Sequence, residues 1–243
     1  MKPDHEPTPH PAEGGDSGAG TWHTNQFAGG APYPTRHYTH VDCGDHGSRY
    51  LELPAESLQI IRAIHEAAHA VIALAGGAHL HHTKIDKPGS PGDTAGATGI
   101  CGLTDSQSVA AYCAAGERAD DRWLRDNGLW TARRAVCVEI GARADRQTLL
   151  ALNSHVGFGD TDIHYQAVHD LADRLIDQHW DQITTLAGHL VERLYLDGSD
   201  VATLTEIDGP ACTCGRSAAR RQARRPWRCW IPAPRPATRW HRR

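Results

Sequence analysis

Apolar side chains recur every three or four residues between positions 60 and 75, and this run constrains the fold most. Its members are Ile60, Ile61, Ile64, Ala68, Val71, Ile72 and Ala75. Such a period places them along the buried face of a helix. Pro54 and Ser57 stand near its expected start, and Gly76-Gly77 closes it where a helix end tolerates positive φ. The run therefore predicts a buried amphipathic or fully enclosed helix.

The same helix carries an HExxH motif, His65-Glu66-Ala67-Ala68-His69. Because positions i and i+4 share one face of a helix, His65 and His69 can direct both imidazoles at one metal ion. Glu66 then projects beside them, where a general base would act on a water held by the metal. The spacing predicts a hydrolytic site with Zn²⁺ as the cofactor.

A catalytic zinc takes three protein ligands and leaves its fourth position to water, so a third ligand is needed. The longer signature HExxHxxGxxH is excluded, because Ile72 and Ala75 occupy the positions of its Gly and its third His. Glu139, in an apolar helical stretch, is one candidate. Asp160 and Asp162 are others, although carboxylates just before a helix also cap backbone amides.

The middle of the chain predicts a mainly α domain with a small β-hairpin. Two extended segments around a glycine-rich connection, near 79–86 and 98–102, form the expected hairpin. Helical periods cover 106–147, broken at Asn127-Gly128, and then 163–176 and 183–194. One domain is expected over residues 51–208.

Both ends differ from this middle in composition. Residues 1–50 are rich in Pro, Gly, His, Thr and Asp and poor in aliphatic side chains, which predicts a disordered extension. Residues 209–243 carry ten arginines, interspersed Pro and Trp, and no acidic residue. The net charge of −4 is thus the sum of −14 over residues 1–208 and +10 over the tail. This tail is also expected to be disordered, and it could bind nucleic acid or an acidic partner.

Seven cysteines, mostly isolated in the sequence, do not form a disulfide framework. Cys212-Thr213-Cys214 lacks the second pair of a zinc ribbon, so we expect no structural zinc there. The sequence has neither a basic segment followed by an apolar signal region nor 18 consecutive apolar residues. These features predict a soluble, cytoplasmic protein without membrane insertion.

Five further histidines lie near the predicted site in the sequence. His79, His81 and His82 follow the glycines that end the helix, and we expect them to face solvent rather than to bind metal. His164 and His169 belong to the helix expected after Asp162. Each of these two is expected either to support a metal ligand or to lie on the surface.

Several segments of the chain are similar, in order, to the FtsH-type zinc peptidase domain, the proteolytic half of membrane-bound AAA proteases. His65-Glu66-Ala67-Ala68-His69-Ala70-Val71 resembles its HEAGHA signature, with Ala68 in place of the usual Gly. Two strand segments of the family resemble Thr83-Lys84-Ile85 and Thr98-Gly99-Ile100. Its GGRAAEE stretch resembles Ile140-Gly141-Ala142-Arg143-Ala144-Asp145, and its GASNDL segment resembles Gly159-Asp160-Thr161-Asp162-Ile163. Its closing helices resemble Leu186-Ala187-Gly188-His189-Leu190-Val191-Glu192. The resemblance covers residues 56–207.

The resemblance implies a mainly helical zinc metallopeptidase domain that hydrolyses peptide bonds of proteins. It implies that His65, His69 and Asp162 bind Zn²⁺ and that Glu66 is the general base. Asp160 stays an alternative ligand, because the spacing after Asp162 is one residue longer than in the family.

The chain departs from the family in one larger respect. A Walker A motif requires Gly-Lys-Ser/Thr, and none of Lys2, Lys84 and Lys87 follows a glycine. We therefore expect an ATP-independent metalloendopeptidase, or one that relies on a separate unfoldase. The alternative is a catalytically inactive, peptidase-like binding or regulatory module tethered through its basic tail, and the retained Glu66 argues against it. The sequence does not predict an oligomeric state.

Overall fold

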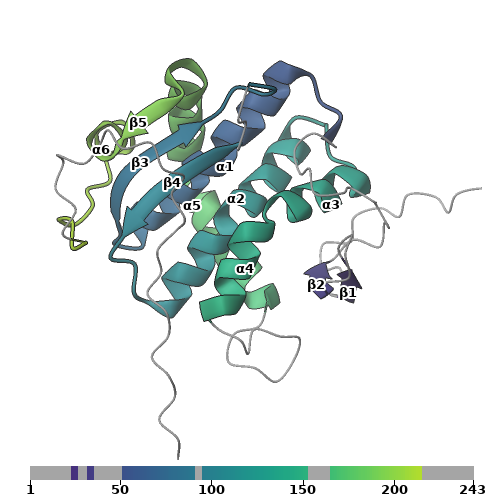
Figure 1. Cartoon of the computed structure of the whole chain (residues 1–243), viewed down its shortest axis with the longest axis horizontal. Helices are drawn as coiled ribbons and strands as arrows, with labels where there is room; N and C mark the ends of the chain where they lie inside the picture. The colour runs from purple at the N-terminus through teal and green to yellow at the C-terminus, as the bar shows by residue number, and fades with distance from the viewer. Residues whose placement is uncertain (1–22, 27–31, 36–50, 91–94, 153–164, 215–243) are drawn as a thin grey trace, which may run out of the picture.

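The computed structural model describes residues 23–26, 32–35, 51–90, 95–152 and 165–214. The elements, in chain order, are β1 (His23–Gln26), β2 (Pro32–Thr35), α1 (Ala55–Ala75), β3 (His79–Ile85), β4 (Gly96–Cys101), α2 (Ser106–Asp126), α3 (Ala132–Gly141), α4 (Arg143–Leu152), α5 (Tyr165–Arg193), β5 (Tyr195–Asp197) and α6 (Gly198–Thr205). The described chain is mainly helical, with a small antiparallel sheet of three strands, β4-β3-β5 (Figure 1). This confirms the predicted mixture of helices and a small sheet.

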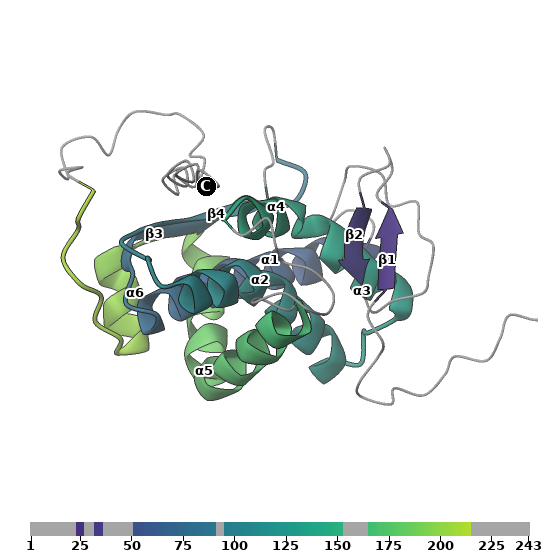
Figure 2. The ribbon, with the colours of Figure 1, turned by 90° about the horizontal axis from the view of Figure 1, so that it is seen from below.

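Helix α1 forms the centre of the protein. It begins after Pro54 and ends before Gly76, and Gly77 follows with φ of 81°, as the sequence predicts. The sheet covers one side of α1, α2 runs beside it, and α5 packs on the far side, so the fold has three layers (Figure 2). Helix α1 is buried nearly throughout from Ile61 to Leu74 because all these elements pack against it.

Among the described residues, α1 is also the one helix that is long and apolar enough to span a membrane. Its most apolar window of 18 residues has a mean hydropathy of 1.3, and 72% of that window is buried inside the protein. Packing in the protein core therefore accounts for the apolar character of the helix.

Strand β3 lies at the centre of the sheet, between β4 and β5. The hairpin of β3 and β4 is the predicted one, with Thr83 opposite Thr98. The register between these strands shifts between Leu80 and His82, so His81 is the extra residue of a β-bulge. Strand β5 and helix α6 were not predicted, because three residues of strand and eight of helix are too short for a periodic signal.

The helices differ from the prediction at one place and agree with it at another. Helix α2 ends at Asn127 as expected, but a break at Ala142 separates α3 from α4, where one helix was predicted. Glycine at position 141 weakens a continuous helix there. The two helices predicted at 163–176 and 183–194 are joined end to end in α5, which leaves helical geometry at His179 (φ −118°, ψ 15°), between the two predicted ranges. The intervening polar stretch contains neither Gly nor Pro to end the helix.

Strands β1 and β2 pair antiparallel, with His23 opposite Thr35. They fall within residues 1–50, for which the composition predicts disorder, and they are the part of that stretch that the structure describes. Residues 215–243 of the basic tail lie outside the described residues.

Candidate metal centre

Two histidines of α1 and one aspartate of α4 bring their ligand atoms together. The Nε2 atoms of His65 and His69 lie 3.2 Å apart. Oδ2 of Asp145 lies 3.6 Å from the first of these nitrogens and 3.5 Å from the second. A tetrahedral zinc with bonds of about 2.0–2.1 Å holds its N and O ligand atoms roughly 3.3 Å apart. The three side chains therefore have the spacing that a zinc ion requires.

The outer nitrogen of each imidazole is held by α2. Nδ1 of His65 donates to Oδ2 of Asp120 at 2.9 Å, and Nδ1 of His69 donates to the carbonyl oxygen of Tyr112 at 2.8 Å. Since a carbonyl and a carboxylate only accept, both Nδ1 atoms carry a proton, so the neutral form of each imidazole presents the lone pair of Nε2. This is the tautomer that a metal site needs.

Tyr112, Gly116 and Asp120 stand four residues apart, so they form one stripe of α2 along the two histidines. Gly116 is the closest of them. A Cβ at this position would lie 2.5 Å from Nε2 of His65 and 2.6 Å from Nε2 of His69. Only glycine therefore leaves room for the two ligand nitrogens at this point of α2.

Glu66 is held by the sheet. The hydroxyl of Thr98, on β4, donates to its Oε2 at 2.7 Å, and the hydroxyls of Thr98 and Thr83 lie 3.0 Å apart. A Cβ at Gly96 would lie 2.6 Å from Oε1 of Glu66, so this glycine allows the strand to approach the carboxylate. The predicted general base is thus buried between α1 and β4, and its orientation is set by a hydrogen bond.

The buried charges of the site shift one another's pKa values. Burial raises the pKa of Glu66, against the opposing effect of His65 and His69, and burial likewise raises the pKa of Asp120. Burial also acts to raise the pKa of Asp145, but the two histidines outweigh it and the pKa is lowered. For His65, burial acts to lower the pKa, yet Asp120, Asp145 and Glu66 together raise it well above its ordinary value. The carboxylates thus favour a cation at this position.

The structure tests only part of the predicted ligand set. It brings His65 and His69 together as predicted, whereas Asp160 and Asp162 lie outside the described residues. Glu139 does not join the histidines, and its Oε1 lies 3.6 Å from Nη2 of Arg146 instead.

Asp145 was not predicted as a ligand, although it stands in the stretch that resembles GGRAAEE. It occupies the first turn of α4, just before a buried arginine, and nothing in its sequence spacing from the HExxH motif identifies it. Only the packing of α4 against α2 brings it to the histidines.

A buried ion pair holds α4 in this place. The guanidinium of Arg146 donates two hydrogen bonds to the carboxylate of Glu117, from Nε at 2.7 Å and from Nη2 at 2.6 Å. Nε2 of His169, on α5, lies 3.6 Å from the same carboxylate. His169 is buried, so of its two predicted placements the surface one is wrong. Because Arg146 follows Asp145 directly, this ion pair positions Asp145 beside the two histidines.

A second group of ligating side chains lies elsewhere on the sheet. The ligand atoms of His81, Cys101, Cys212 and Cys214 all lie within 4.8 Å of one another. The sequence predicts solvent-facing histidines after α1 and no structural zinc at the Cys-x-Cys pair, and both expectations are corrected here, because these residues meet only in the tertiary structure.

A comparison with protein-family models finds none that matches this chain, and a comparison with curated proteins finds no significant match. Inference about function therefore rests on the residues of the site.

Proposed function

We propose that this protein is a zinc-dependent metalloendopeptidase of the FtsH peptidase type. His65, His69 and Asp145 bind the ion in this proposal, and Glu66 is the general base. One observation carries it: the two Nε2 atoms converge with a carboxylate oxygen at zinc spacing, while the glutamate of the same motif lies buried beside them. A zinc ion bound there would supply Lewis acidity, which activates water and polarises a carbonyl group.

The pKa of Glu66 supports its role. In the metal-free protein, burial raises this pKa above the ordinary value of a carboxyl group, against the opposing effect of His65 and His69. Burial thus makes the carboxylate a stronger base, as acceptance of a proton from water requires. The hydrogen bond from Thr98 keeps the carboxylate in one orientation while it does so.

The position of β4 supports a peptide substrate. Strand β4 is an edge of the sheet β4-β3-β5, and it carries Thr98, which contacts Glu66. An extended peptide can add to the edge of a sheet through backbone hydrogen bonds. A peptide bound along β4 would pass close to the general base, which favours amide bonds of extended protein segments as the substrate.

The sequence contains no Walker A motif, so the substrate would be flexible or already unfolded, or another polypeptide would unfold it. The basic residues of the tail make nucleic acid or an acidic protein a further partner to test. A gel shift at low salt, with and without residues 209–243, tests that partner, because phosphate contacts by arginine are sensitive to salt.

The test of the proposed function compares the zinc-loaded parent with Glu66→Gln on an unfolded, casein-like protein. We expect the variant to keep its zinc and to lose cleavage by about 10²-fold or more, the contribution typical of a general base. Glu56→Gln, an exposed carboxylate in the first turn of the same helix, is the matched control and should keep both properties. Equal cleavage by the parent and Glu66→Gln would refute the mechanism. A zinc-loaded parent without any cleavage would instead favour the inactive binding module.

A further inference from the structure

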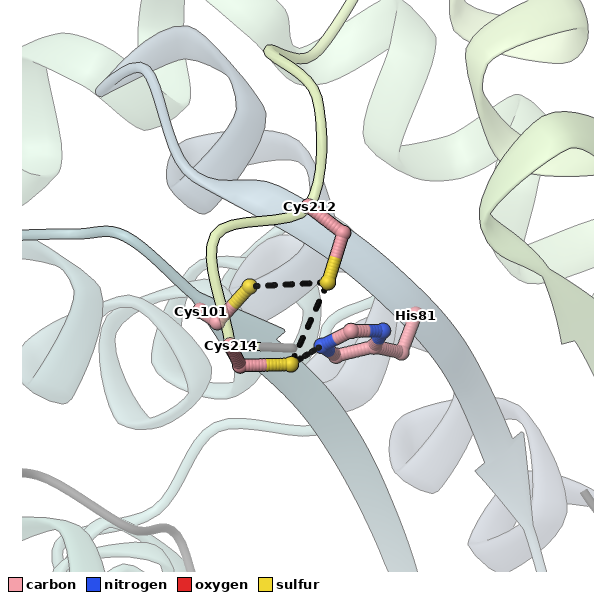
Figure 3. Close-up of side chains that lie close together, drawn as sticks. All are labelled: His81, Cys101, Cys212 and Cys214. Carbon is pink, nitrogen blue, oxygen red and sulfur yellow. Dashed lines mark hydrogen bonds between the residues drawn. The ribbon is translucent and has the colours of Figure 1, made fainter. Parts of the chain in front are cut away.

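Four ligating side chains from three distant parts of the chain meet at one end of the sheet. Sγ of Cys101 lies 3.8 Å from Sγ of Cys212, and the latter lies 3.2 Å from Sγ of Cys214. Nε2 of His81 lies 3.5 Å from Sγ of Cys214. Figure 3 shows the three sulfur atoms and this nitrogen directed at a common centre.

Strands β3 and β4 place the first two of these side chains. Cys101 is the last residue of β4 and pairs with His79, the first residue of β3. His81 is the extra residue of the β-bulge in β3, and a bulge redirects a side chain relative to the regular alternation of a strand. The β-bulge therefore lies at His81, the residue whose side chain is directed toward Cys101.

The segment after α6 brings the other two. Nδ1 of His79 donates to the carbonyl oxygen of Pro210 at 2.8 Å. Gly209 lies so close to the sheet that a Cβ there would be 3.0 Å from the carbonyl oxygen of Ala78. Because of these contacts, residues 209–210 lie against the start of β3, and Cys212 and Cys214 lie near Cys101.

The distances match a tetrahedral zinc site. With Zn–S bonds of about 2.3 Å and Zn–N bonds of about 2.0–2.1 Å, neighbouring ligands lie roughly 3.8 Å apart for two sulfurs and 3.6 Å for sulfur and nitrogen. The Cys101–Cys212 and Cys214–His81 distances agree with these values, and the Cys212–Cys214 distance is somewhat shorter. The Cys101–Cys212 and Cys212–Cys214 separations are both well beyond the roughly 2.05 Å of a disulfide.

We propose that His81, Cys101, Cys212 and Cys214 form a structural zinc site, separate from the site at His65 and His69. Four protein ligands fill the tetrahedral shell and leave no position for water, which distinguishes a structural from a catalytic zinc. Three thiolates and an imidazole select zinc rather than magnesium or calcium, which prefer oxygen.

This site fastens the segment after α6 to the β3-β4 hairpin. The first of the ten tail arginines, Arg216, follows Cys214 by two residues in the sequence. The metal therefore sets the point on the domain from which the basic stretch of sequence continues. It also joins segments more than 100 residues apart, and such a cross-link restricts the unfolded chain strongly.

Metal content of the full chain, purified in the presence of zinc and without chelator, provides the test. We expect two zinc ions per chain in the parent, and one both in His65→Ala/His69→Ala and in Cys212→Ser/Cys214→Ser. His81→Gln should also retain one. Its matched control is His82→Gln, at the next residue of the same strand, since the ring of His82 stacks on Tyr195 and does not belong to the group of His81 and the three cysteines. This control should retain two.

Cobalt substitution of the His65→Ala/His69→Ala protein tests the ligands of the proposed site without any substitution at His81 or the three cysteines. We expect a thiolate-to-cobalt charge-transfer band in the near ultraviolet, because thiolates would be the ligands of the remaining ion. Absence of this band would overturn the proposal. So would a parent whose zinc content is unchanged by Cys212→Ser/Cys214→Ser, or cysteines of this group that resist alkylation until a reductant opens a disulfide.

Discussion

Oδ2 of Asp120 accepts a hydrogen bond from Nδ1 of His65 at 2.9 Å, and this bond turns Nε2 of the imidazole toward His69. The carboxylate lies on α2 and the imidazole on α1, so the orientation of the ligand depends on the packing of two helices. A carboxylate behind a histidine ligand also makes the imidazole a stronger donor to a metal.

Asp120→Asn should therefore weaken zinc binding by roughly 10- to 100-fold, the usual effect of removing such a partner. Competition with a chelating dye measures this affinity. Asp126→Asn changes an exposed carboxylate at the end of the same helix and serves as the control, with unchanged affinity expected. If both variants bind zinc as tightly as the parent, Asp120 has no part in orienting His65.

Gly116→Ala should remove zinc binding at the site of His65 and His69 and leave one zinc per chain, because the added Cβ would lie 2.5 Å from Nε2 of His65 and displace both rings. Hydrogen bonds to α2 hold these rings, so they cannot turn away without losing a partner. Gly188→Ala on α5 is the control. Its Cβ meets nothing within 4 Å, and alanine should raise the free energy of unfolding by about 0.5–1 kcal/mol. Elemental analysis and chemical denaturation distinguish the two outcomes, and full zinc content in Gly116→Ala would contradict the placement of α2.

The third ligand is decided by comparing three carboxylate variants. Asp145→Asn should lose the zinc of the His65 site, because its Oδ2 is the oxygen beside both Nε2 atoms. Glu139→Gln should retain it, since this carboxylate lies by Arg146. Asp162→Asn tests the ligand implied by the resemblance. Loss of zinc in Asp162→Asn but not in Asp145→Asn would reverse the assignment made from the structure.

Arg146→Met should destabilise the protein by about 3–5 kcal/mol, because it leaves the buried carboxylate of Glu117 without its main partner. Urea denaturation of the metal-free proteins measures this. Replacing the pair together, Glu117→Leu with Arg146→Met, should restore part of the loss, since the carboxylate of Glu117 is then removed along with its partner. The recovery should stay incomplete, because buried Glu139 and His169 each lose a contact with this pair. Zinc binding should stay weakened in the double variant, because Arg146 no longer holds α4 and its Asp145. A single variant as stable as the parent would show that the ion pair is not a structural support.

The pKa of His65 predicts how stability depends on pH in the metal-free protein. Burial acts to lower this pKa, but Asp120, Asp145 and Glu66 raise it well above 6.5. A histidine whose pKa is higher in the folded state contributes its full stabilisation below the unfolded pKa and loses it as pH rises through the folded pKa. The melting temperature in chelator should therefore fall as pH rises above about 6.5, whereas zinc affinity should rise as protons compete less.

His65→Ala is the control for this pH dependence. It removes the titrating group, so its melting temperature in chelator should vary less over the same pH range. Parallel curves for the parent and His65→Ala would show that His65 does not carry the effect.

Local patterns in the sequence predicted those helices and strands whose formation depends on residues close together in the sequence. The apolar period and the two glycines located α1, and the spacing of His65 and His69 placed both imidazoles on one side of it. The sequence also predicted the β3-β4 hairpin and the end of α2, which is capped by Asn127. These features follow from backbone geometry within a few residues, which tertiary packing changes little.

Contacts between distant segments were decided only by the tertiary structure. Asp145 reaches the histidines because a buried ion pair docks α4 on α2, and the need for glycine at position 116 arises from the same packing. His81 and Cys101 meet Cys212 because a β-bulge and the path of the chain after α6 bring them together. The sequence by itself determined that α1 presents two histidines and a glutamate, since helical geometry is local. The fold decided which carboxylate and which cysteines complete the two candidate sites, because that depends on how remote helices and strands pack.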